Sequence, residues 1–362
     1  MKIGIVTLWD SNDNYGQILQ CYALQHYLYL QGHEVELIKV INDANDKKKL
    51  VSRILGLPFK FVSFRFWSLL VFRVKSKKFT KIYGNVDRGF EQFRTKYIHT
   101  TDKVYDLSQL KSEKLLYAAY ITGSDQVWGS LSKVFFLDFV KSSPKYSYAA
   151  SFGNNPFSKE GCQFMKRMLE SFNCITVREQ AGVKRCATMG FPATRVIDPT
   201  GLLSKDDYLE IAYLPKEKGY VLVYLLGNFT DVNIKSIYQF AKDRNIEVKY
   251  VASQARNDRY DKIFPSPPEW LGLIANAEYV FTNSYHCCMF SMYFEKKFKF
   301  FKLNGIFKKM NTRMETLLTE YSIPWIENIN DIDEILFDYQ KINQKFLADK
   351  DKAVNILKTW FK

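Results

Sequence analysis

The chain has 362 residues, which is too long for one ordinary hydrophobic core and favours two domains. Its 47% hydrophobic and 25% charged residues are typical of a globular protein and exclude the disordered and collagen-like classes. Lys and Arg (52) outnumber Asp and Glu (38), and the formal net charge of +14 favours an anionic partner. Nucleic acid, an anionic membrane surface and a phosphorylated or carboxylated small molecule all fit that charge.

Cysteine usage and apolar runs indicate where the protein works. The six cysteines show none of the spacings that hold zinc and are expected to be reduced thiols of a cytoplasmic protein. The opening "MKIGIVTLWD" is typical of a strand and not of a signal peptide, and no apolar run reaches the roughly 18 residues of a membrane span. A cytoplasmic location is expected, with peripheral attachment to the inner face of the membrane left open.

The first forty residues predict a strand, helix, strand unit. "KIGIVTL" is a buried type of strand, the loop "WDSNDNYGQ" follows, and apolar residues at helical spacing predict a helix from Ile18 to Gln31 before the strand "HEVELIKV". Such units form parallel sheets, which bind ligands beyond the carboxyl ends of their strands.

A basic aromatic insertion interrupts this pattern. Residues 47–81 contain eleven Lys or Arg and no acid. Basic residues interleaved with Phe, Trp and Leu fit a helix that lies on an anionic membrane surface. An ordinary helix packed on its domain remains the alternative. The aromatic residues are clustered and not spaced as stacking platforms, and no nucleic-acid motif is present, so nucleic acid is not expected as a partner.

The remaining pattern predicts two Rossmann-like, doubly wound α/β domains that face a cleft, which is the architecture of the GT-B glycosyltransferases. The first domain spans residues 1–203 and carries the basic insertion at about 47–97, and the second spans 204–330. Residues 331–362 form a C-terminal helical segment that is long enough to pack back across both domains. The second domain starts with the strand "YVLVYLLG" and includes a helix whose cap is the Ser of "SPPE".

The stretch "EYVFTNSYHCCMF" holds the strongest candidate for catalysis. A strand ends at Thr-Asn-Ser, so His286 falls in the first turn of a helix that Asn283 or Ser284 caps. Free N–H groups and the helix dipole form an anion site there. A bound phosphate or carboxylate would favour the histidine cation, which suits an acid or base that works when substrate is present. The alternative is a histidine hydrogen-bonded in the core.

Two loops of the first domain are candidates for binding sugar hydroxyls. One is the loop after the first strand, which is neither a GxGxxG nor a Walker loop and therefore disfavours dinucleotides and P-loop nucleotides. The other follows the strand that ends in "GSDQVW". Turn formation and capping are their alternatives. The residues concerned are Asn14, Tyr15, Gly16, Gln17, Asp125 and Gln126.

Two further positions are candidates for binding an anion. Arg178 ends the strand "CITVRE", where a guanidinium can bind a carboxylate or phosphate with two hydrogen bonds. Asn311 and Arg313 lie at the start of the helix "NTRMETLL". An ion pair with Glu179 or another acid is the alternative for Arg178, and simple capping with solvated charge is the alternative for the other two.

These stretches together resemble the polysaccharide pyruvyl transferase family, from residue 3 to about residue 322. That family transfers the enolpyruvyl unit of phosphoenolpyruvate to a sugar, usually as a pyruvate ketal on two hydroxyls, in capsule and exopolysaccharide assembly. The stretches that carry the resemblance are "NYGQILQCYALQHYL", "GSDQVW", "SYAASFG", "VRE", "DPT", "SPPEWLGLIANAEYVFTNSYH" and "NTRMETLL".

The resemblance implies a role for individual residues. His286 matches the family histidine and would donate a proton, Arg178 matches an arginine that holds phosphoenolpyruvate, and Asn14 and Gly16 match a loop on the acceptor side. Many members carry an arginine two positions before the histidine, where this chain has Ser284. Cys287 also replaces the usual glycine. Either Arg313 supplies the missing charge, or the donor or the activity differs.

The resemblance also implies the substrates. Phosphoenolpyruvate would be the donor, a lipid-diphosphate-linked oligosaccharide the acceptor, and neither a metal nor another cofactor is expected. A GT-B glycosyltransferase that uses a nucleotide sugar, and a non-catalytic saccharide-binding protein of the assembly machinery, remain the alternatives.

Overall fold

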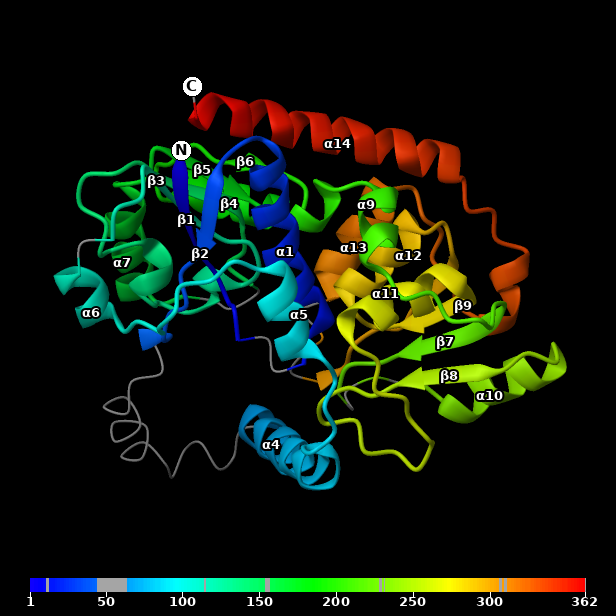
Figure 1. Cartoon of the computed structure of the whole chain (residues 1–362). Helices are drawn as coiled ribbons and strands as arrows, with labels where there is room; N and C mark the ends of the chain where they lie inside the picture. Colours follow the sequence, from blue (N-terminus) through cyan, green and yellow to red (C-terminus); the bar gives the residue numbers. More distant parts are fainter. Residues whose placement is uncertain are drawn as a thin grey trace. The chain divides into compact units, whose positions relative to one another are not determined.

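The computed structural model describes residues 1–10, 13–43, 64–113, 115–153, 157–227, 230, 232–305, 308 and 311–361, and it gives the backbone alone for 64–69, 72 and 313. The chain divides into two compact units (Figure 1). Unit 1 holds the described residues within 1–53, 94–203 and 346–362, and unit 2 holds those within 54–93 and 204–345.

Unit 1 is built on a six-stranded parallel sheet with strand order β2-β1-β3-β4-β5-β6. The strands β3 and β4 are buried along their whole length, as expected for a parallel sheet covered on both faces. The order reverses between β1 and β3. The strands are β1 (Lys2–Val6), β2 (Glu34–Leu37), β3 (Ala119–Thr122), β4 (Lys145–Ala150), β5 (Cys174–Val177) and β6 (Thr194–Arg195).

The helices of unit 1 connect these strands. Asn14 caps α1, and its side chain accepts a hydrogen bond from Gln17 N. The helix therefore starts at Tyr15, three residues before the predicted start, because its N-cap lies in the loop and not at the first apolar residue. The helices are α1 (Tyr15–Leu30), α5 (Phe90–Tyr97, continuing from unit 2), α6 (Leu107–Ser112), α7 (Lys159–Leu169) and α8 (Gln180–Thr188).

Unit 2 is built on a four-stranded parallel sheet with strand order β10-β9-β7-β8. The order reverses between β7 and β9. Every residue of β7 is buried, and the aromatic rings of α10 (Ile234–Asp243) and β9 pack together in the core beside it. The strands are β7 (Tyr220–Tyr224), β8 (Val248–Val251), β9 (Ala277–Thr282) and β10 (Lys297–Phe300).

Local capping signals set several helix starts in unit 2. At α11, Ser266 and Glu269 form the predicted capping box ahead of the first-turn prolines. The helices are α4 (Phe64–Tyr83), α9 (Lys205–Ile211), α10 (Ile234–Asp243), α11 (Pro267–Asn276), α12 (Tyr285–Tyr293), α13 (Asn311–Glu320) and α14 (Tyr339–Trp360).

The two parallel sheets confirm the predicted fold class of two Rossmann-like, doubly wound α/β units. The cleft that they were expected to face stays a prediction. Unit 2 takes up the chain again at Ser204, where the sequence places the domain boundary.

The basic insertion is where the observed division differs from the expected domains. Its residues before Phe64 lie outside the described residues. Its described part up to Phe93 groups with unit 2 and not with unit 1. The Tyr83 ring of α4 lies 5.1 Å from the Phe264 ring, and Asn257 Nδ2 donates to the Lys75 carbonyl at 2.7 Å. These contacts join segments distant in the sequence, so chain order alone could not reveal them.

The C-terminal segment forms the predicted helix, α14. Residues 339–345 belong to unit 2, where Asn343 donates to Glu295. The rest belongs to unit 1, where the Trp360 ring stacks on Tyr146 at 4.5 Å.

Candidate functional site

At the carboxyl edge of the unit 2 sheet, the side chain of Asn283 connects the segments that follow β7 and β9, between which the strand order reverses. Asn283 follows β9, and its Oδ1 accepts from Leu226 N at 2.6 Å while its Nδ2 donates to Leu226 O at 3.0 Å. Thr282 Oγ1 also donates to the Tyr224 carbonyl at 2.7 Å. In open α/β sheets the reversal point is where ligands bind, so this edge is a candidate site on the evidence of topology.

His286 lies in the first turn of α12, directly beyond this point, as the sequence predicts. Of the two predicted caps, Ser284 is the N-cap: its Oγ accepts from Cys287 N at 3.4 Å. His286 is 9% exposed. The position at a helix N-terminus is therefore observed, whereas the role of the imidazole as a proton donor stays a prediction.

The thiol next to His286 is not suited to act as a nucleophile. Burial raises the pKa of Cys287 to about 12, so the group remains a thiol at neutral pH. All six cysteines are free, in agreement with the expected reduced thiols.

Two buried arginines bring positive charge to the same edge of unit 2, and the sequence analysis missed both. Arg88 Nη2 donates to the Ala252 carbonyl, just beyond β8, at 3.1 Å. Arg256 Nη1 donates to the Gly227 carbonyl, beyond β7, at 3.3 Å, and its Nε pairs with Asp258 at 2.8 Å. No local motif marks Arg88, because its partner lies 164 residues away in the sequence.

The reversal point of unit 1 joins the two predicted hydroxyl-binding loops. Thr7 Oγ1, after β1, donates to the Ser124 carbonyl, after β3, at 3.0 Å. The buried amide of Gln20 accepts from Ser124 N at 3.2 Å and donates to Thr7 Oγ1 at 3.4 Å. The loop that carries Asp125 is thereby fixed beside the loop after β1. Gln20 was not predicted, because a glutamine inside a helix gives no sequence signal for this contact.

Arg178 lies among three carboxylates of unit 1. Its Nη1 is 3.0 Å from Asp198 Oδ2, its Nε is 3.2 Å from Glu179 Oε1, and its Nη2 is 3.7 Å from Asp125 Oδ1. The Arg178 side chain is only 2% exposed. The ion pair with Glu179 is the alternative that the sequence left open. Donor binding by Arg178 stays a prediction, and it requires the guanidinium to exchange a carboxylate for the donor.

Asp198 is the second residue that the sequence analysis missed in unit 1. Its Oδ1 accepts from Thr200 N at 3.1 Å, and its Oδ2 accepts from Ser124 Oγ at 3.2 Å. Together with the Arg178 pair, these bonds make Asp198 the centre of the buried network. Its signal was the "DPT" that follows a strand, where an aspartate both caps a turn and faces the carboxyl edge.

The other predicted acceptor residues differ in how much they expose. Asn14 is exposed, and Asp125, Gln126 and Gln17 are partly exposed, although Gln17 Nε2 donates to the Leu8 carbonyl. Tyr15 and Gly16 are buried. The Tyr15 ring is a core element at 0% exposure, which argues against a direct contact between this side chain and a sugar.

The predicted anion site at α13 is described only in part. Asn311 is buried, and it accepts from Leu303 N and donates to Leu303 O, both at 2.8 Å. This side chain holds the backbone, so a contact with the donor would have to replace one of these bonds. The side chain of Arg313 lies outside the described residues.

A sequence model of the family described as polysaccharide pyruvyl transferase matches residues 14–301. The chain belongs to the polysaccharide pyruvyl transferase family. It is therefore a transferase, and the expected resemblance is confirmed over both units. No curated protein matches the chain closely enough to count as a relative.

Two solved structures are similar to the chain at low sequence identity. A UDP-GlcNAc 2-epimerase from Neisseria meningitidis, bound to UDP-GlcNAc, shares 9% identity over 98% of this pyruvyl transferase chain and 94% of its own, with a TM-score of 0.49. The glycosyltransferase SnogD from Streptomyces nogalater shares 11% identity over 98% and 95%, with a TM-score of 0.43.

No group of three or more His, Cys, Asp or Glu residues suited to hold a metal ion occurs in the described part of the chain. The expected absence of a metal stays a prediction.

Proposed function

We propose that this pyruvyl transferase moves the enolpyruvyl unit of phosphoenolpyruvate onto a sugar of a lipid-linked bacterial polysaccharide precursor and forms a pyruvate ketal. The observation that carries the proposal is His286 in the first turn of α12, at the reversal point of the unit 2 sheet. A proton donor at that position lies beside the free backbone N–H groups of the helix N-terminus, which favour the binding of an anion.

The reaction balances with one acid and two hydroxyl groups. His286 gives its proton to the methylene carbon of phosphoenolpyruvate, which becomes a methyl group and leaves the neighbouring carbon an oxocarbenium-like electrophile. The first sugar hydroxyl attacks that carbon, and its proton returns to the histidine. The carbon–oxygen bond to phosphate then breaks with its electron pair on phosphate. The second hydroxyl takes that place, and its proton leaves with the phosphate.

The proposal assigns the donor to unit 2. Arg88 and Arg256 place two guanidinium groups at the carboxyl edge, and the N-terminus of α12 adds its partial positive charge. This positive charge would compensate for the arginine that many family members have where this chain has Ser284. Arg313 remains a further candidate for contacts with the donor, and the predicted contact with Arg178 of unit 1 is the alternative that the Arg178→Ala variant tests.

The proposal assigns the acceptor to unit 1. Asp125 and Glu179 are partly exposed carboxylates beside the buried Arg178 guanidinium. Carboxylates accept hydrogen bonds from hydroxyl groups, whereas a trianionic donor would meet their repulsion. Asn14, Gln17 and Gln126 add amide groups near these loops.

A lipid-diphosphate-linked acceptor places the enzyme at the cytoplasmic face of the membrane. The resemblance to the family implies a role in surface polysaccharide assembly, which is the reason for proposing a lipid-linked acceptor. No helix in the described part of the chain is both long and apolar enough to cross a membrane.

The first experiment measures thermal melting with phosphoenolpyruvate, together with phosphate release in the presence of a lipid-linked oligosaccharide. At a donor concentration of about one hundred times Kd, stabilisation of roughly 2.7 kcal/mol is expected. The variant His286→Gln should keep that stabilisation and lower kcat by about a hundredfold to ten-thousandfold. Full turnover by His286→Gln would remove the assignment.

The same experiment separates the alternatives. Stabilisation by a nucleotide sugar, without any by phosphoenolpyruvate, would identify a glycosyltransferase. Glycan binding without phosphate release would identify a non-catalytic saccharide-binding protein. If Arg178→Ala is no longer stabilised by phosphoenolpyruvate, the donor binds at Arg178. If the variant melts at a lower temperature but is still stabilised by phosphoenolpyruvate, Arg178 has a structural role.

A further inference from the structure

Helix α4 is anchored to unit 2 along one side. Phe79 is buried, and its ring contacts Tyr83, which in turn contacts Phe264. Asn257 holds the Lys75 carbonyl on the same side. Residues 75, 79 and 83 are four apart and share one face of the helix. The opposite face is therefore held in a fixed orientation away from the core of unit 2.

The outward face of α4 mixes aliphatic and basic side chains. Leu70 and Val74 are 40% and 59% exposed, although both are large and apolar. Lys77, Lys78 and Lys81 are exposed and follow at positions i+7, i+8 and i+11 from Leu70. These spacings place all five on neighbouring turns of one helix face. The sequence of the whole helix contains no acid.

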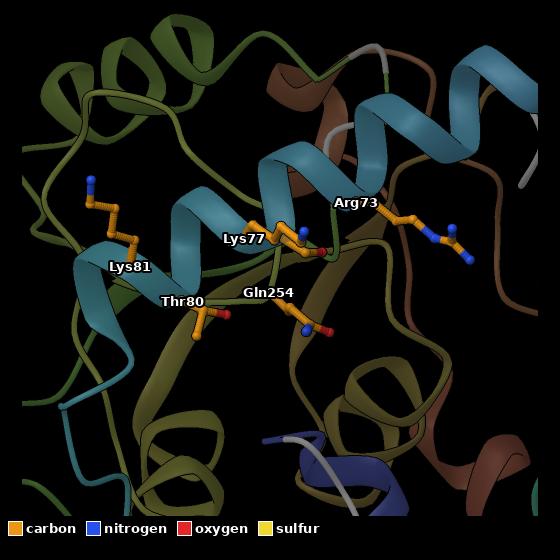
Figure 2. A pocket seen from close by; sticks show the side chains of 6 residues that line it. Arg73, Lys77, Thr80, Lys81 and Gln254 are labelled. Carbon is orange, nitrogen blue, oxygen red and sulfur yellow. The ribbon is translucent and has the colours of Figure 1, made fainter.

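The basic side chains spread along the helix and do not converge on one point. A shallow hollow of about 850 Å³ lies against α4 and is lined by Arg73, Ser76, Lys77, Thr80, Lys81 and Gln254. Figure 2 shows Arg73, Lys77 and Lys81 one turn apart along the helix, with Arg73 and Lys81 directed to opposite sides. Arg73 and Lys81 are eight residues apart, or about 12 Å along the helix, so a single phosphate would not reach the whole row, whereas an extended anionic surface can.

We infer that the outward face of α4 docks the enzyme on an anionic phospholipid membrane. Leu70 and Val74 would enter the boundary between headgroups and acyl chains, and the lysine ammonium groups would stay among the phosphates. The inference deepens the proposed function, because it names the surface that brings the enzyme to a lipid-linked acceptor. It requires no contact with the residues of the candidate active site.

A nucleic acid fits this face less well than a membrane does. Nucleic-acid surfaces combine cations with aromatic rings on which bases stack. The exposed apolar side chains described on α4 are aliphatic, and aliphatic side chains gain most by leaving water for hydrocarbon. The occupant that matches both charge and apolarity is the membrane surface.

The test measures flotation of the full chain with vesicles of phosphatidylcholine, alone or mixed with phosphatidylglycerol. Binding should require phosphatidylglycerol and weaken as salt is raised. The triple variant Lys77→Gln, Lys78→Gln, Lys81→Gln should lower the partition coefficient by about a hundredfold. The double variant Leu70→Ser, Val74→Ser should lower it by about tenfold, because binding scales with buried apolar area.

A matched control uses exposed lysines of α14, a helix that also contains acids. The triple variant Lys341→Gln, Lys352→Gln, Lys358→Gln removes the same charge and should bind vesicles like the parent. Equal losses in both triple variants, or equal binding to neutral vesicles, would overturn the inference. The inference would also be overturned if the parent bound single-stranded RNA but not vesicles, and the α4 variants lost that RNA binding.

A soluble acceptor separates this inference from the proposed function. The α4 variants should release phosphate from phosphoenolpyruvate and a lipid-free oligosaccharide at the parent rate. Vesicle binding without any turnover would contradict the proposed function alone. Turnover on the soluble acceptor without vesicle binding would contradict the docking surface alone.

Discussion

The carboxyl edges of the two sheets have the same strand topology and differ in how their buried arginines are held. In unit 1, three carboxylates surround the guanidinium of Arg178. In unit 2, Arg88 and Arg256 each donate to a backbone carbonyl beyond a strand, and Asp258 is the carboxylate paired with Arg256. Both edges lie at the reversal point of a parallel sheet, where ligands bind.

Under the proposed function, this difference would let one type of fold serve two substrates. An edge rich in carboxylates offers acceptors to hydroxyl groups and repels a phosphate, and an edge rich in guanidinium groups does the reverse. The two edges also differ in how they are held. A buried charge network holds the edge of unit 1, whereas neutral bonds from Asn283 to one backbone residue span the reversal point in unit 2.

The largest effect on folding is expected from the charge network of unit 1. The variant Asp198→Ala leaves the buried Arg178 guanidinium without its closest carboxylate and Ser124 Oγ without its acceptor. Breaking a buried pair from one side costs about 3–5 kcal/mol of the free energy of unfolding. Urea unfolding of the variant and the parent measures this cost.

A neighbouring carboxylate provides the control for this comparison. Glu179 also pairs with Arg178, but its side chain is partly exposed and water can replace it. Glu179→Ala should cost about 1 kcal/mol. Equal costs for the two variants would mean that burial does not set the strength of this network.

A smaller effect is expected at the edge of unit 2. The variant Asn283→Ala removes both side-chain bonds to Leu226, which should cost about 1–3 kcal/mol. Because Asn283 precedes the turn that positions His286, kcat should also fall, by about tenfold to a hundredfold. Urea unfolding and steady-state phosphate release measure the two effects separately.

Asn311 offers a matched control within unit 2. Its amide makes the same pair of bonds to Leu303 that Asn283 makes to Leu226. Asn311→Ala should lose similar stability and keep kcat, and a raised KM for phosphoenolpyruvate would support its predicted role at the donor. Loss of kcat in both variants would show that Asn283 has no special part in positioning His286.

Local signals made the edge of unit 2 predictable from the sequence. An apolar run that ends at Thr-Asn-Ser sets the end of β9 and the start of α12, because a strand needs apolar residues and a helix needs a cap. The location of His286 follows from these two rules. These rules could not predict which residue caps α12, because Asn283 and Ser284 can both cap a helix. The contact of Asn283 with Leu226 leaves Ser284 as the cap.

Contacts between distant segments could not be predicted in this way. The sequence left open whether Arg178 binds an anion or pairs with an acid, because its surroundings depend on Asp198 and Asp125, which follow other strands. Arg88 lies in the insertion that chain order assigned to the first domain, and packing against the segment after β8 places it in unit 2. Hydrophobic periodicity reports which face of an element is buried, and it does not report its neighbour.

The smallest effect is expected at Asp333, a carboxylate of unit 2 that lies near the start of β10 and away from the carboxyl edge of the sheet. Asp333 accepts hydrogen bonds from Lys297 Nζ at 2.7 Å, Tyr279 Oη at 2.7 Å and Arg244 Nη2 at 3.0 Å. Burial raises the pKa of Asp333, but these donors outweigh burial and hold the pKa at about 2, below its ordinary value of 3.8.

The sign of the pH effect follows from that shift. The unfolded chain binds the Asp333 proton at a higher pH than the folded chain does, so this carboxylate stabilises the fold above about pH 4 and loses its contribution as the pH falls towards 2. The side chain is 38% exposed, and solvent should limit the contribution to under about 1 kcal/mol. Urea unfolding of the parent and of Asp333→Asn should therefore differ at about pH 5 and converge at about pH 2. If the difference in the free energy of unfolding between parent and variant stayed constant across that range, the charge of Asp333 would not contribute to stability.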